Sequence, residues 1–385
     1  MVGLATVLMA ARLYGSYGVA GALSAANAVA WAIGTAFLAH LVDRHGQRRI
    51  MLPTAMLSAA SLAGMLVLAL VHAPLATLFA CTIVSGFTSG SPGAMVRARW
   101  NSILPSSSKL HTAYALESTL DEVCFVVGPV LATWLATSVH PVAGLVGPIV
   151  FGAGGAMIFY SLRATEPPVI HREVTRREHN RFLLLYPGLA TVVGVGMLTG
   201  CLFGSIDIAT VAATTAWDLV STAGLILAAM SLGSGIGGLL YGSRGWTSPL
   251  WKRFILGVCL LGVLVCSLFL ATGALILGIC GFVAGFFVAP TFINANALIS
   301  HLVPQDRLTE GLAWLGTSIG IGVSIGATVS GHIIDLVSYH GGFAFTAGCG
   351  LLAAVLALGS WGMLKRITSA TTDSSAAPAS MPPSA

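Results

Sequence analysis

Long apolar segments alternate with short polar ones along the whole chain. Segments 18–42, 50–71 and 254–299 contain no Asp, Glu, Lys or Arg, and each is long enough for one or two bilayer crossings of about 20 residues. The pattern predicts a partial helix followed by a series of full ones: 1–12, then 18–42, 50–72, 75–97, 112–137, 141–162, 186–213, 217–243, 253–272, 274–299, 310–336 and 341–364.

Composition places these helices in a membrane. Of the 385 residues, 56% are hydrophobic and only 8% are charged, and the mean hydropathy is +0.89. A soluble protein built of helical repeats needs charged outer faces on its helices, which this chain cannot supply. The seven cysteines lie in apolar segments without a CxxC pair, so we expect packing roles for them and no metal or disulfide site. The expected class is an all-α, multi-pass membrane protein.

Positive charge collects on one side of the predicted membrane. If 1–12 is the first helix, every Lys and Arg except Arg12 follows an even-numbered helix. By the positive-inside rule, that side and the C-terminus face the cytoplasm. The basic residues on this side are Arg44, Arg48, Arg49, Arg97, Arg99, Lys109, Arg163, Arg172, Arg176, Arg177, Arg181, Arg244, Lys252, Arg253, Arg307, Lys365 and Arg366.

The chain also repeats itself internally. Segment 109–135 aligns without gaps to 307–333, and Gly86-Phe87 with Gly90 recurs as Gly281-Phe282 with Gly285. Duplicated halves of this kind are a known transporter architecture. We therefore expect a domain organisation of two six-helix bundles, a cytoplasmic linker and a disordered tail: 1–162, 163–185, 186–364 and 365–385.

The repeat places the counterpart of the seventh helix partly before Met1. Segment 1–12 is too short to cross a bilayer alone. We expect that part of the first helix is missing from this sequence; the alternative is a genuinely shortened protein.

The stretch AHLVDRHGQRR at 39–49 lies between the second and third predicted helices. It resembles the loop signature of the major facilitator superfamily, G-x-x-x-D-R-x-G-R/K-R/K, with alanine for the first glycine and Gln47 for a basic residue. The resemblance extends over the whole chain and implies a bacterial transporter with twelve helices in two bundles. It also implies a cytoplasmic gate latch that holds one half against the other, formed by Asp43, Arg44, Gly46, Arg48 and Arg49. The alternative is that these basic residues only set topology.

A second, weaker similarity is Gly128-Pro129 in the fifth helix, which resembles the core of the family's antiporter motif. The glycines that usually flank that core are absent. A proline-induced kink alone accounts for the pair equally well.

Carboxylates within the predicted membrane are the best candidates for chemistry, because burying a charge there must be compensated. They are Glu117, Asp121 and Glu122 in the fifth helix and Asp207 in the seventh. Glu117 and Asp121 are four residues apart and share a helix face. We expect no Lys or Arg deep enough to neutralise these acids, which suits proton carriers and disfavours an anionic substrate. Alternatives stay open, since Glu117 could reach the interface and Glu122 could pair with a polar neighbour.

Four polar or aromatic residues could line a binding cavity: Asn27, Trp31, Asn294 and Asn296. Hydrogen bonds between helices are the alternative.

These observations predict a proton-coupled secondary transporter, most simply an exporter of small hydrophobic or cationic compounds. The alternatives are a facilitator or importer of a neutral compound and a transport-inactive sensor. We expect no enzymatic activity, cofactor, metal or nucleic-acid partner. The expected partners are a small-molecule substrate, protons and the lipid bilayer, for a monomer in the plasma or inner membrane.

Overall fold

The computed structural model describes residues 2–104, 108–167, 188–244, 246–303 and 308–366. This described part contains helices and no strand. The helices are α1 (Val2–Tyr14), α2 (Tyr17–His45), α3 (Gln47–Leu70), α4 (Leu75–Ser89), α5 (Pro92–Ile103), α6 (Ser108–Ser138), α7 (Val146–Ser161), α8 (Leu189–Ala216), α9 (Ala223–Gly242), α10 (Leu250–Val265), α11 (Ala274–Gly285), α12 (Val288–Leu302), α13 (Leu308–Leu336) and α14 (Tyr339–Gly359), with short 3-10 turns between some of them.

The helices suit a membrane. Within the described residues, 9 helical stretches are long and apolar enough to cross one. The predicted all-α membrane class is therefore confirmed. Most of the expected linker and of the expected tail lies outside the described residues.

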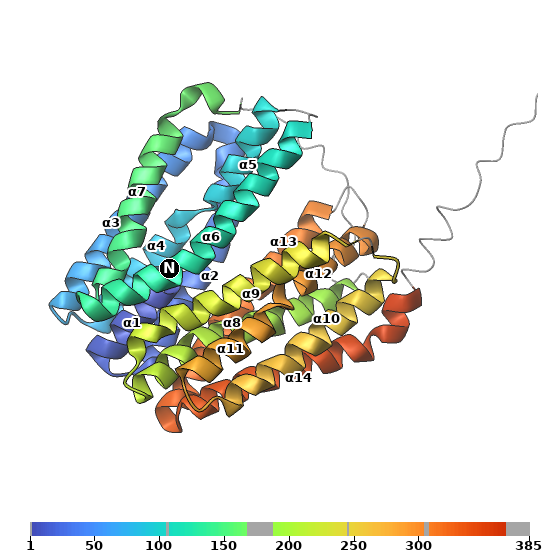
Figure 1. The fold of residues 1–385 in the computed structure, drawn as a ribbon. Coiled ribbons are helices and arrows are strands. Elements are labelled where there is room, and N and C mark those ends of the chain that lie inside the picture. The colour runs from blue at the N-terminus through green and yellow to red at the C-terminus, as the bar shows by residue number, and fades with distance from the viewer. Residues whose placement is uncertain (1, 105–107, 168–187, 245, 304–307, 367–385) are drawn as a thin grey trace, which may run out of the picture.

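Figure 1 shows two bundles, one made of α1–α7 and the other of α8–α14. In the second bundle, α8 packs against both α13 and α14, and α10 packs against α12 and α14. In the first, α4 packs against α2 and α3. Helix α1 has only 13 residues, yet Leu8 and Met9 are fully buried in the core.

Two helices expected to be continuous are broken, at equivalent places in the two bundles. The segment expected at 75–97 ends its first part at Ser89, and Gly90 has a positive φ of 61°. Pro92 then starts α5, in the first turn, where its missing N–H costs nothing. The segment expected at 274–299 breaks after Gly285, the repeat of Gly90.

We call the end of the helices that holds the α2–α3 turn, Arg244 and Arg366 the basic end, and the other end the opposite end. The bundles contact each other toward the opposite end, where the backbones come close. A Cβ on Gly21 of α2 would overlap the Ala327 carbonyl of α13, and one on Gly224 of α9 would overlap the Pro129 carbonyl of α6. In Figure 1 the ribbons of the two bundles lie farther apart toward the basic end, near α5 and the first turns of α13. The backbones of the two bundles are therefore closest to each other toward the opposite end.

Candidate ion-pair cluster and gate contacts

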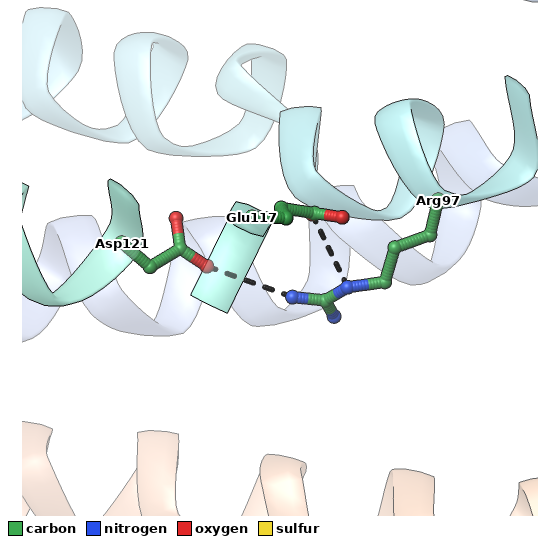
Figure 2. A network of polar contacts seen from close by, with 3 residues as sticks. All are labelled: Arg97, Glu117 and Asp121. Carbon is green, nitrogen blue, oxygen red and sulfur yellow. Dashed lines mark ion pairs between the residues drawn. The ribbon is translucent and has the colours of Figure 1, made fainter. Parts of the chain in front are cut away.

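An ion-pair cluster joins α5 to α6 (Figure 2). Arg97 Nε lies 3.2 Å from Glu117 Oε1, and Arg97 Nη2 lies 3.6 Å from Asp121 Oδ2. The two acids are one helical turn apart on α6, so a single guanidinium reaches both. This confirms the shared face predicted for Glu117 and Asp121. The expectation that no basic residue neutralises them is wrong.

The three side chains of this cluster differ in exposure. Glu117 is only 10% exposed at its side chain, whereas Arg97 is 52% and Asp121 54% exposed. Neither carboxylate oxygen of Glu117 has a hydrogen-bond partner among the described residues, so the Arg97 ion pair is its main compensation for burial. Gly93 on α5 lies next to Glu117, since a Cβ at Gly93 would be in ordinary van der Waals contact with Oε1, at 3.5 Å.

Of the other two candidate acids, Asp207 lies on a different helix from this cluster. Glu122 belongs to α6, but its side chain is outside the described residues. Asp207 lies partly buried on α8, a helix that packs mainly against α13 and α14.

The residues of the expected gate latch surround the α2–α3 turn. Gly46 has φ 88°, a conformation that favours glycine, and its N–H donates to the Val42 carbonyl at 2.8 Å. The backbone N–H of Arg48 donates to Glu166 Oε1 at 2.9 Å. Arg44 and Arg49 are exposed, while the side chain of Asp43 is outside the described residues. The contacts described at this turn lie within the first bundle, so a latch to the second bundle stays a prediction.

Sequence reasoning missed Arg99, which is 3% exposed and anchors the basic end of the first bundle. Its Nε donates to Gln47 Oε1 at 2.9 Å. Its Nη1 donates to the carbonyls of Phe159 and Leu162 and to Thr165 Oγ1 at 2.9, 3.1 and 2.9 Å. The guanidinium also lies 3.9 Å from the centre of the Phe159 ring. The break at Gly90 starts a new helix, α5, which turns Arg97 toward α6 and Arg99 toward α3 and α7.

Gln47 is the departure from the family signature, and the Arg99 contact explains it. Gln47 is 4% exposed; it accepts from Arg99 and donates from Nε2 to the Met95 carbonyl at 3.2 Å. A basic residue here would place a second positive charge against Arg99 and lose the acceptor.

Three of the four residues proposed to line a cavity make hydrogen bonds between helices. Asn27 Nδ2 donates to the Thr82 carbonyl at 3.2 Å, and Trp31 Nε1 donates to the carbonyl of Gly90 at 2.8 Å. Asn27 also borders a cavity of about 430 Å³ in the first bundle. Asn294 accepts from the Tyr241 hydroxyl at 2.7 Å. The fourth residue, Asn296, is exposed.

Gly128 and Pro129 lie at the contact between the bundles. Gly128 is buried, and the Pro129 carbonyl packs against Gly224 of α9. The pair therefore has a packing role, whatever its relation to antiport.

A second connection between the bundles lies at the opposite end. Asp335 of α13 accepts at Oδ2 from Ser16 Oγ and from the Gly18 N–H, both at 2.7 Å, and at Oδ1 from the Tyr17 N–H at 2.8 Å. The carboxylate thereby satisfies free N–H groups in the first turn of α2. Ser16 itself caps α2, accepting from the Val19 N–H at 3.1 Å. Asp335 is exposed to solvent while it makes these hydrogen bonds.

The family model for the Major Facilitator Superfamily matches residues 1–217 and again 189–380. The chain belongs to the major facilitator superfamily. The expected two-bundle transporter fold is confirmed, and members of this family are membrane transporters and in general not enzymes.

Solved structures agree on the fold. A mutant of the nucleoside transporter NupG has a TM-score of 0.74 at 13% identity, covering 93% of this chain and 94% of that one. A mutant of the peptide transporter POT has a TM-score of 0.70 at 12% identity, covering 95% and 92%. The human organic anion transporter MFSD10 has a TM-score of 0.62 at 15% identity, covering 92% and 97%. No curated protein matches the sequence significantly.

Proposed function

We propose that this major facilitator superfamily chain is a proton-coupled secondary transporter that exports small hydrophobic or cationic compounds. The basic end is then the cytoplasmic end, by the positive-inside rule, and the end at which the backbones of the bundles approach closely is the outer one. The observation that carries the proposal is the cluster of Arg97, Glu117 and Asp121.

The charge of the cluster supports exchange between protons and cations. One guanidinium and two carboxylates sum to a net charge of −1 when all three are ionised. A single proton or a single positive charge on a substrate would neutralise it, so the two compete. Such competition is the physical basis of antiport, and the negative sum disfavours an anionic substrate.

Exposure divides the roles of the two acids. Asp121, with a side chain 54% exposed, would be the acid that exchanges protons with its surroundings. Glu117, at 10% exposed, keeps Arg97 in place. When Asp121 takes up a proton, Arg97 and Glu117 form a neutral pair, and the bundles can close over the site at lower electrostatic cost.

A facilitator or importer is the second candidate, favoured by the fold's similarity to a nucleoside transporter and a peptide transporter. Such a protein would tolerate loss of Asp121. A transport-inactive sensor would move none of the probes.

Flux into proteoliposomes separates these functions. The purified protein is reconstituted with and without a pH gradient, and uptake of ethidium, tetraphenylphosphonium and uridine is measured beside internal pH. We expect gradient-driven movement of a cation by the wild type and its loss in Asp121→Asn. Asp218→Asn is the matched control, because Asp218 is exposed at the opposite end with φ 57°, which asparagine accepts. Movement of uridine alone, unaffected by the gradient and by Asp121→Asn, would exclude proton-coupled export.

A further inference from the structure

A cavity of about 360 Å³ lies at the basic end of the second bundle, between α9, α10, α12 and the turn that precedes α12. Arg244 and Arg253 both line it, and none of the described residues in the lining is Asp or Glu. Within the described part of the chain, the cavity therefore has a positively charged lining, and it is separate from the cluster on α5 and α6.

The protein holds Arg253 in place along the cavity wall. Its Nη1 donates to the Tyr241 hydroxyl at 3.2 Å, and that hydroxyl donates to Asn294 Oδ1 at 2.7 Å. Asn294 is 1% exposed and is fixed in turn by donating to the Pro290 carbonyl at 2.8 Å. The guanidinium is thus oriented before any ligand arrives.

One buried N–H donor of the Arg253 guanidinium makes no hydrogen bond to the described residues. Arg253 Nε is buried and has no hydrogen-bond partner among the described residues. A buried donor without an acceptor is destabilising. Because Nε has almost no accessible surface, a ligand oxygen would contact the other donors of the guanidinium, along the cavity wall that Arg253 lines. A phosphate oxygen has the geometry to bridge neighbouring guanidinium donors.

Arg99 offers a comparison from the first bundle, since Asn294 is its repeat by the same offset that relates Gly90 to Gly285. Arg99 has protein acceptors for Nε and Nη1, while its Nη2 has none among the described residues. In the second bundle the guanidinium comes from α10 instead, and there it is Nε that has no acceptor.

The rim of the cavity is apolar and aromatic. Trp246 stacks on Tyr241 with 4.6 Å between ring centres and donates to the Tyr241 carbonyl at 2.8 Å. Leu240 and Leu256, which also line the cavity, are 54% and 59% exposed. Tryptophan beside basic residues is typical of the headgroup level of a membrane.

We propose that this cavity binds the phosphate headgroup of an anionic phospholipid, with the acyl chains along Leu240 and Leu256. Arg253 contacts the phosphate from the wall and Arg244 from the mouth. Basic pockets between membrane helices bind lipid headgroups in this way. Free phosphate shares the chemistry but would not use the exposed leucines.

The test is lipid binding by the full-length protein in detergent. Phosphatidylglycerol and phosphatidylcholine are titrated separately, and bound lipid is counted by native mass spectrometry beside the shift in melting temperature. We expect the wild type to prefer phosphatidylglycerol, and Arg253→Gln and Arg244→Gln each to weaken its binding about tenfold or more. Arg163→Gln is the matched control, since Arg163 is an exposed arginine of the first bundle, and should keep wild-type binding.

Three outcomes would overturn the proposal. Equal binding of the two lipids would exclude an anionic headgroup site, as would equal losses in all three variants. A titration with inorganic phosphate in place of lipid tests the third. If it alone stabilises the wild type and phosphatidylglycerol does not, the site is for soluble phosphate. Arg244 is exposed, so Arg244→Gln should fold normally. It keeps the test decisive even if Arg253→Gln fails to fold.

Discussion

Asp335 allows a quantitative test of how the two bundles are held together at the opposite end. The substitution Asp335→Asn keeps the size of the side chain but removes its charge and one acceptor. The amide NH₂ group would then face donors from the first turn of α2, where the carboxylate accepts three hydrogen bonds. The closed arrangement of this end should lose stability relative to the one in which it opens.

The magnitude follows from the contacts. Two of the three hydrogen bonds are exposed to solvent and one is partly buried. For such a site the loss of a helix N-cap, about 0.5–2 kcal/mol, is a better guide than the value for a buried charge. Taking about 1.4 kcal/mol, the equilibrium between the two arrangements shifts about tenfold toward opening at this end.

Distances between spin labels measure this shift. Val71 of the first bundle and Leu270 of the second both lie at the opposite end, with exposed fractions of 68% and 72%. Each can be replaced by a labelled cysteine once the 7 native cysteines have been substituted. We expect Asp335→Asn to enlarge the long-distance population about tenfold. Asp218→Asn, which also removes an aspartate charge from this end, should leave it unchanged. If both variants give the wild-type distribution, the Asp335 contacts do not hold the bundles together.

Three further substitutions test the contacts within and between the bundles. Arg97→Gln leaves Glu117 buried without its counter-charge and should lower the stability by about 1–3 kcal/mol, measured as a lower melting temperature. The double variant with Glu117→Gln should recover most of the lost stability. A double variant as unstable as Arg97→Gln would argue against the ion pair. Arg99→Ala removes a buried guanidinium, leaves several neutral acceptors without their donor and should cost about 1–3 kcal/mol, whereas Arg163→Ala on the surface should change the melting temperature little. Gly21→Val should push α2 from α13 and favour opening at the opposite end in the same spin-label assay; an unchanged distribution would contradict the close approach.

Most of the fold could be predicted from the sequence, because hydrophobic segment length and the internal repeat are strong signals. The breaks after Ser89 and Gly285 could not, since the segments around them are apolar throughout and only Gly90 and Pro92 hint at an interruption. A continuous helix was the simpler prediction. The backbone conformation at Gly90, with φ 61°, depends on packing that the pattern does not contain.

Of the ion-pair cluster, the two acids could be predicted from the sequence and the arginine could not. The acids Glu117 and Asp121 stand out because they interrupt an apolar helix, but Arg97 was assigned to a loop by counting helix ends. Its contact with α6 depends on the new direction that α5 takes after the break. The bonds of Asp335 to α2 join residues 317 to 319 positions apart, a pairing that no local pattern reveals.

The break at Gly90 has a consequence for how a local event spreads through the protein. Helix α5 is a short rod of 12 residues, with Arg97 attached to the carboxylates of α6 on one face and Arg99 attached to α3 and α7 on the other. Because α5 is not continuous with α4, its two arginines connect the acids of α6 to α3 and α7 without involving α4. A change at the acids of α6 would therefore be expected to reach α3 and α7 through α5, and a spectroscopic label on α5 would test this.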